Sequence, residues 1–204
     1  MNLNIKMKKV MHSNKAFAIV IIATVAAFSS CSNMGDKISV SKTEIDSLRN
    51  QIKEMTAGNE VLSKNLATFD TLDYTVFSNQ QWVRLHESHS KDIKVNWPDG
   101  HFTIGIEKHI EDLKAMFVYA PDTRIKQHPV RFGSSNGEWT AVTGVFEGTF
   151  TKPMPVGNGK FLPPTGKAFK MPMCTIGHWK DGVMIEEYLF WDNMTYMNQI
   201  GLGK

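Results

Sequence analysis

The sequence predicts an α+β domain in which helices cover one face of an antiparallel sheet. Apolar residues recur at helical spacing before residue 121, and strand-like alternation dominates after residue 124. The dipeptide Asp181-Gly182 lies between two alternating runs and is typical of a β-hairpin turn. The strands are apolar on both faces. We therefore expect helices over one face, with a concavity beneath them, and a second copy of the chain over the other.

The first expected elements of the domain are helical. Residues 78–81 form a capping-box pattern. The helix predicted after it carries Trp82, Leu85, His86 and His89 on one face. Residues 92–97 alternate like a strand and stop at the turn-forming residues 98–100. A second helix is expected from Gly105 and must end before Pro121.

Strands are expected through most of the remaining chain. They are predicted at residues 124–132, 138–150, 168–180 and 183–192, with a turn at 133–137. Residues 151–167 form a long loop with four prolines, which we expect to line the rim of the concavity or a dimer contact. A short helix at 193–200 closes the domain at Gly201.

The charge of the chain argues against nucleic acid as a partner. The net charge is +3, but four lysines lie in the first 30 residues, which contain no Asp, Glu or Arg. Removing them leaves a charge of −1, so the basicity belongs to the N-terminus. The two cysteines exclude a disulfide scaffold and a four-thiolate zinc site.

Residues 1–30 have the features of a bacterial lipoprotein signal. Lysines precede a 13-residue apolar run, residues 16–28, which is too short to cross a bilayer. Ser29, Ser30 and Cys31 follow and resemble a lipobox, which implies that Cys31 is acylated. We expect a lipid anchor in the bacterial cell envelope, facing the periplasm or the surface. The alternative is an ordinary signal peptide cleaved nearby.

Residues 31–61 are expected to form a polar tether and a helical stalk before the domain at 62–204. An apolar seam of the heptad type contains Ile45, Leu48, Ile52, Met55, Asn59, Leu62, Leu66 and Phe69. The seam fits a coiled coil that dimerises the protein. It also fits an amphipathic helix whose second half packs on its own domain. Gly58 weakens the middle of this helix.

Four side chains are the candidates for acid–base catalysis: Glu187, Asp192, Glu147 and His86. Strand alternation places Glu187 and Glu147 among apolar neighbours, where burial would raise a carboxyl pKa toward neutrality. Asp192 is expected on the opposite face of its strand from Glu187 and is also a candidate cap for the last helix. Each of these residues has a structural alternative as a cap, ion pair or surface group.

Six residues are expected to line a ligand pocket: Trp82, Trp97, His109, Trp139, Met173 and Trp191. Together they favour a small, apolar or carbonyl-containing molecule. His86 and His89 could supply half of a metal site, but no third ligand accompanies them in the sequence. We therefore expect no metal and no cofactor.

Several stretches resemble the SnoaL-like polyketide cyclase or ester cyclase group of the nuclear transport factor 2-like superfamily. They are NWPDG (96–100), GIEKHIEDLKAMFVYAPD (105–122), EWTAVTGVFEGTFTKPM (138–154), PPTGKAF (163–169) and GVMIEEYLFWDNMTYMNQIGL (182–202). The resemblance spans about residues 62–202. It implies a cone-shaped curved antiparallel sheet wrapped by helices, with a cavity between them, and a homodimer formed through the outer sheet face.

The resemblance leaves two functions open. Its cyclases use an acid on the last long strand, and many relatives read E-x-W-D-x-x-D there. Here Leu189 stands in the first Asp position and Asp192 in the second. The chain is therefore expected to be either a membrane-anchored enzyme with cofactor-independent acid–base chemistry or a non-catalytic ligand-binding or assembly lipoprotein.

Overall fold

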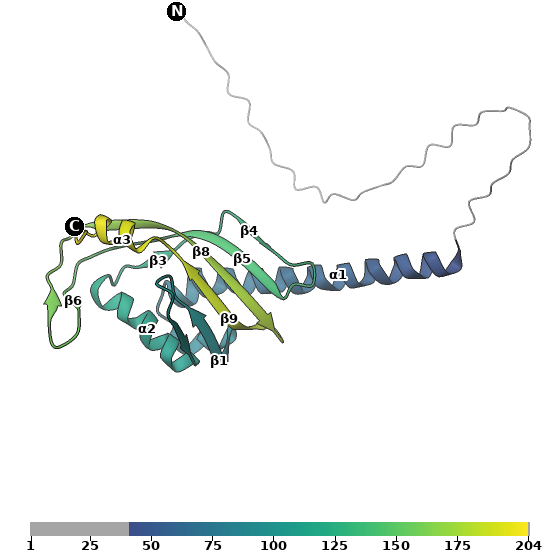
Figure 1. The fold of residues 1–204 in the computed structure, drawn as a ribbon, viewed down its shortest axis with the longest axis horizontal. Helices are drawn as coiled ribbons and strands as arrows, with labels where there is room; N and C mark the ends of the chain where they lie inside the picture. The colour runs from purple at the N-terminus through teal and green to yellow at the C-terminus, as the bar shows by residue number, and fades with distance from the viewer. Residues whose placement is uncertain (1–40, 204) are drawn as a thin grey trace, which may run out of the picture. The chain divides into compact units, whose positions relative to one another are not determined.

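A computed structural model describes residues 41–203 of the chain (Figure 1). The predicted lipoprotein signal, Cys31 and the start of the tether lie outside the described residues. Among residues 41–203, no helix combines the length and the apolar character that crossing a bilayer requires. The described chain forms a sheet with helices against one face, as the sequence predicts (Figure 1). The sheet is antiparallel except for one parallel pair of strands.

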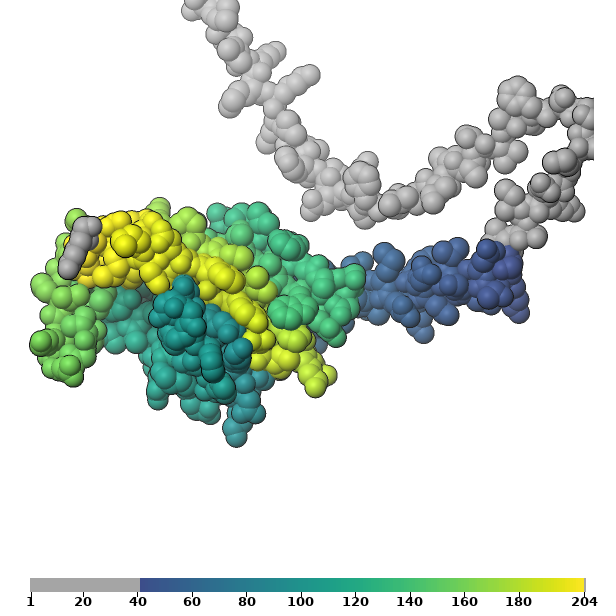
Figure 2. Space-filling model, in the orientation of Figure 1, coloured from purple at the N-terminus to yellow at the C-terminus, as the bar shows by residue number. Residues whose placement is uncertain are grey.

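Helix α1 (Lys42–Thr71) is the longest element and runs on into a π-helix, η1 (Leu72–Phe77). Ser41 and Glu44 form a reciprocal capping box at its start, with bonds of 2.8 and 3.2 Å. Residues 42–57 are exposed throughout, and this half projects beyond the rest of the domain (Figure 2). The second half packs inward, where Phe69 is part of the core.

Gly58 allows α1 to approach the sheet closely. A Cβ atom there would lie 1.9 Å from the Ser135 carbonyl oxygen, so only glycine fits this contact. About two helical turns further on, the buried Asn65 donates a 3.0 Å hydrogen bond to the Gly137 carbonyl oxygen. These two contacts dock α1 on the turn before the longest strands.

The segment after η1 differs from the sequence prediction. Residues Trp82–Glu87 form a short 3₁₀-helix, η2, and strand β1 (His89–Asn96) begins three residues earlier than expected. His89 therefore lies on a buried strand position and not on a helix with His86. Helix α2 (Ile106–Tyr119) follows as predicted and buries His109, Leu113 and Phe117.

The main sheet has seven strands. Its path is β2-β1-β9-β8-β5-β3, and β4 also pairs with β5. The remaining strands are β2 (Phe102–Ile104), β3 (Arg124–Ile125), β4 (Arg131–Gly133), β5 (Trp139–Thr149), β8 (Ala168–Lys180) and β9 (Val183–Phe190). All neighbouring pairs are antiparallel except β1 with β9, which is parallel. The long loop holds a small hairpin of β6 (Met154–Pro155) and β7 (Phe161–Leu162), and α3 (Asn193–Gln199) closes the domain.

A β-bulge in β9 changes which side chains face inward. His178 pairs with Glu186 and Trp179 pairs with Met184, so Ile185 has no partner of its own on β8. Met184 and Glu187, three residues apart, are both buried. Beyond the bulge the alternation continues, and Leu189 and Trp191 share the face of Glu187.

The two faces of the sheet have different surroundings. On the inner face, Val142 and Phe146 of β5 pack into the core with η1 and α2. On the outer face, the Trp139 indole stacks on His178 with ring centroids 4.1 Å apart. The cover of this outer face by a second copy of the chain stays a prediction.

Candidate functional site

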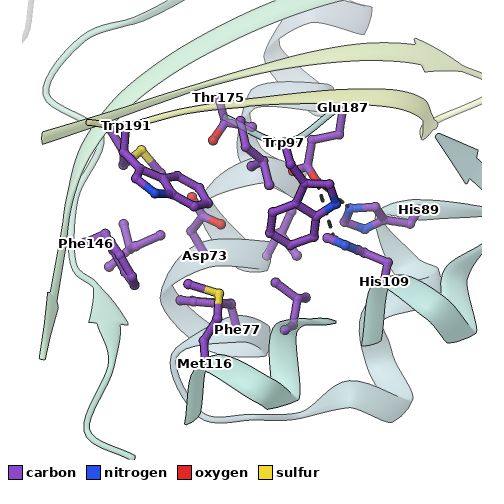
Figure 3. Close-up of a pocket in the computed structure, with 15 residues that line it drawn as sticks. Asp73, Phe77, His89, Trp97, His109, Met116, Phe146, Thr175, Glu187 and Trp191 are labelled. Atoms are coloured by element: carbon purple, nitrogen blue, oxygen red, sulfur yellow. Dashed lines mark ion pairs between the residues drawn. The ribbon is translucent and has the colours of Figure 1, made fainter. Parts of the chain in front are cut away.

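A cavity of about 60 Å³ lies between the inner face of the sheet and the helices (Figure 3). Its walls come from η1, α2 and strands β1, β3, β5, β8 and β9. Most of the lining is apolar, including Phe77, Met116, Phe146 and Leu189. By volume the space holds a few water molecules. The polar groups in it form two clusters.

The first cluster joins three buried side chains from different elements. Glu187 of β9 places Oε2 3.4 Å from His109 Nε2 on α2 and 3.8 Å from His89 Nε2 on β1 (Figure 3). The outer nitrogen of His89, Nδ1, lies 2.9 Å from Ser88 Oγ. Neither His89 Nε2 nor Glu187 Oε2 has a hydrogen-bond partner among the described residues.

Burial sets the charge of this cluster. It lowers the pKa of His109 to about 4, so this imidazole is neutral at pH 7. Burial acts to raise the pKa of Glu187, but the imidazoles of His89 and His109 outweigh it and the net shift is downward. The raised pKa expected for Glu187 is therefore wrong, because two buried imidazoles lie beside the carboxylate.

The second cluster connects the cavity with the surface. Asp73 on η1 lines the cavity, and its Oδ2 lies 2.8 Å from Nε2 of the buried His128. His128 Nδ1 lies 2.9 Å from Asp70 Oδ1, and Asp70 pairs with Arg131 at the surface. Among the described residues, no hydrogen bond involves Asp73 Oδ1.

The pKa values of this second cluster follow from burial and pairing. Burial raises the pKa of Asp73, although the bond to His128 works against this, and Glu187 adds to the rise by charge repulsion. Burial acts to lower the pKa of His128, but the bonds to Asp73 and Asp70 outweigh it and raise the pKa. A buried carboxyl group with a raised pKa is suited to proton transfer near neutral pH.

Sequence reasoning missed Asp73, although the sequence carries a signal for it. The apolar seam of α1 advances by three and four residues to Leu62, Leu66 and Phe69, and its next position is Asp73. An acid at a core position of an amphipathic helix is a candidate functional group.

Three of the predicted catalytic residues lie outside the cavity. Glu147 is on the outer side of β5, where Lys126 at 2.5 Å and Arg124 at 2.9 Å lower its pKa to about 2. Asp192 caps α3 by accepting a 2.9 Å bond from the Met194 amide. His86 is exposed on η2, with Nδ1 2.7 Å from the Val83 carbonyl oxygen. The prediction that these three side chains act in the pocket is therefore wrong.

Of the predicted lining residues, Trp97, His109, Met173 and Trp191 line the cavity. Trp82 does not, because it packs edge-on against Phe77 and Phe117 behind the lining. Trp139 does not either, because its parity on β5 places it on the outer face. Within residues 41–203, the group with metal-ligand spacing is His89, His109 and Glu187, and His86 has no part in it.

The sequence model of a family described as SnoaL-like polyketide cyclase matches residues 68–200. No match was found among the curated proteins.

Three solved structures illustrate the fold similarity. A candidate SnoaL-like polyketide cyclase from Jannaschia sp. CCS1 is 19% identical at a TM-score of 0.60, covering 71% of this chain and 96% of that one. A candidate polyketide cyclase from Xanthomonas campestris pv. campestris is 14% identical at a TM-score of 0.59, covering 69% of this chain and 99% of that one. IdmH, a candidate polyketide cyclase from Streptomyces antibioticus, is 22% identical at a TM-score of 0.56, covering 67% of this chain and 98% of that one.

Proposed function

Because the chain belongs to the SnoaL-like polyketide cyclase family, we propose that its cavity binds a small, largely apolar carbonyl compound and exchanges protons with it. The observation that carries this proposal is the pair of buried acids, Asp73 and Glu187, in the wall of one mostly apolar cavity. A buried acid in an apolar pocket is costly to keep, and such groups cluster at functional sites.

Asp73 is the group we assign to the proton transfer. Its raised pKa makes its carboxylate a stronger base than an ordinary aspartate. His128 holds Oδ2 at 2.8 Å, which fixes the carboxyl group against the helix and leaves Oδ1 for a substrate. A proton removed from a carbon beside a carbonyl would pass to this oxygen, as isomerisation or aldol closure requires.

The cluster of Glu187, His89 and His109 is the polar end of the proposed binding site. The carbonyl oxygen of a bound compound can lie against the imidazoles, while the aromatic wall of Trp97, Phe146 and Trp191 contacts its apolar body. The cavity is small, so a ligand larger than a few waters needs movement of flexible lining side chains such as Met116.

Exchange of α-hydrogens for deuterium tests this function directly. We expect the full chain to accelerate deuterium uptake at the α-carbon of simple ketones such as 2-tetralone, followed by NMR in D₂O. Asp73→Asn is expected to lower the rate by roughly 10²-fold or more. Asp192→Asn makes the same chemical change outside the cavity and should keep the rate. Equal rates for the two variants would remove Asp73 from the mechanism.

The second candidate function is ligand binding without catalysis. The observation in its favour is Leu189, an apolar side chain in the cavity wall at the position where the resemblance places an acid. Saturation-transfer NMR on the same ketones separates the two candidates. Binding with no exchange above the buffer rate would support this alternative over the enzyme.

A further inference from the structure

We propose that His89, His109 and Glu187 bind a divalent transition-metal ion, with an open coordination position facing the cavity. The proposed donors are Nε2 of both imidazoles and one carboxylate oxygen, Oε2. They come from β1, α2 and β9, so three separate elements converge on one point (Figure 3). Two imidazoles and one carboxylate are a donor set that Zn²⁺, Fe²⁺ and Co²⁺ accept.

The spacing of the three donors fits an ion of this size. Two donors bound tetrahedrally at about 2.1 Å lie about 3.4 Å apart. Glu187 Oε2 is 3.4 Å from His109 Nε2 and 3.8 Å from His89 Nε2, and one ligand atom from each residue lies within 4.8 Å of the others. Small rotations of the side chains bring all three donors to bonding distance.

The hydrogen bond of His89 prepares its inner nitrogen for a cation. The Ser88 hydroxyl donates to the Leu85 carbonyl oxygen at 3.1 Å, so its lone pair is left to accept from His89 Nδ1–H. In this tautomer Nε2 carries a lone pair. His89 Nε2 lies 3.8 Å from Glu187 Oε2, and both atoms are buried without a hydrogen-bond partner among the described residues. A polar contact on the outer nitrogen is typical of metal-binding histidines.

The charge balance of the site also favours a cation. Among the described residues, Glu187 has no ion pair with any lysine or arginine, and its only ion-pair neighbours are the two histidines. A buried carboxylate is strongly unfavourable unless a positive charge joins it. A divalent ion supplies that charge and satisfies His89 Nε2 and Glu187 Oε2, two of the three buried atoms of the cluster that have no hydrogen-bond partner among the described residues.

The open position determines what the ion would do. The protein supplies three donors, and the remaining side of the site faces the cavity lined by Trp97 and Leu189. Three protein ligands with one open position is the pattern of a catalytic metal site. If the carbonyl oxygen of a ligand bound there, its C=O bond would be polarised. The carbon beside the carbonyl would then lose a proton to Asp73 more readily. This role rests on the proposed function, whereas metal binding itself does not.

Metal uptake tests the proposal without any substrate. The full chain is purified, stripped with a chelator and titrated with Co²⁺, whose visible spectrum reports the number and kind of its ligands. We expect one equivalent to bind with the spectrum of a low-coordinate nitrogen–oxygen site. Zn²⁺ should displace it, as measured by mass spectrometry of the metal content.

Variants locate the site. His89→Gln, His109→Gln and Glu187→Gln are each expected to lower the affinity for Co²⁺ by 10-fold or more, with folding checked by circular dichroism. His86→Gln removes an exposed imidazole three residues from His89 and should bind like the wild type. No uptake by the wild type, or equal losses in all four variants, would overturn the proposal. Asp73→Asn should keep the metal and lose deuterium exchange, so failure of one proposal is distinct from failure of the other.

Discussion

His128 Nε2 lies 2.8 Å from Asp73 Oδ2, and this bond joins the wall of the cavity to a charged chain that ends at the surface. On its other side, His128 Nδ1 lies 2.9 Å from Asp70, which pairs with the exposed Arg131. A protonated imidazole donates from both nitrogens, so it satisfies both carboxylates at once. When it is protonated, His128 therefore holds the cavity acid as a buried cation.

The first prediction is that His128 stays protonated above pH 6.5, because the two carboxylates raise its pKa. The imidazole resonances can be followed by NMR and assigned with His128→Gln. Asp70→Asn removes one carboxylate and should lower this pKa by about one unit or more. The same pKa in wild type and Asp70→Asn would contradict the proposed coupling.

The stability of the domain should depend on pH through the protonation of His128. Since the folded pKa of His128 lies above the unfolded value, its contribution is fully present below about pH 6.5 and is lost as pH rises through the folded pKa. We therefore expect the Tm to fall as the pH rises from about 6.5 through the folded pKa. In His128→Gln the fall should be absent, although the Tm is lower at every pH.

Glu147 should act in the opposite pH range. Its folded pKa of about 2 lies below the ordinary 4.5, because Lys126 and Arg124 bind the carboxylate. Its contribution is present above about pH 4.5 and is lost as pH falls toward 2. Because both cations are largely exposed to solvent, we expect the ion pairs to contribute at most about 1 kcal/mol to the free energy of unfolding at neutral pH. Urea unfolding of Glu147→Gln at pH 3 and pH 7 measures this, and ketone exchange should be unchanged.

Gly58→Ala should destabilise the protein, although helix propensity predicts the reverse. In an exposed helix this change stabilises by about 1 kcal/mol. Here the new Cβ would meet the Ser135 carbonyl oxygen at 1.9 Å, so α1 must move away from the sheet. We expect a loss of roughly 1–3 kcal/mol in the free energy of unfolding. A gain in stability would show that α1 does not dock on this turn.

The exposed half of α1 should associate with a second copy of itself. Leu48, Ile52 and Met55 are 55–63% exposed along one seam, and a seam of this kind favours a coiled coil. Chemical cross-linking at low protein concentration should capture a dimer of the full chain. Leu48→Gln with Ile52→Gln should reduce it. Val83→Gln, at an exposed apolar position on η2, is the matched control.

The order of helices and strands was predictable, because local spacing and turn residues determine it. Helix α2, the Asp181-Gly182 hairpin and the cap at Asp192 lie where these signals place them. The site was only partly predictable. Glu187 and His109 could be named, but alternation cannot show which face is inner when both faces are apolar. Glu147 was assigned to the wrong face for this reason.

Two further residues depended on tertiary structure. His89 follows a 3₁₀-helix that ends early, so its strand position is not visible from helical spacing. Asp73 faces the cavity because the helix continues past its predicted stretch as η1, where the bond to His128, 55 residues away, holds it. Contacts so distant in sequence have no local signature.

The unpaired Ile185 gives β9 a property that its composition does not show. Without Ile185, the residues that follow the bulge would reverse which face of the sheet they occupy relative to the residues that precede it. After deletion of this one codon, β9 could still pair with β8. The deletion would, however, move either Glu187 from the interior to the solvent or Met184 out of the core. Within this architecture, a single-residue insertion or deletion is a short evolutionary route between a reactive interior and an inert one.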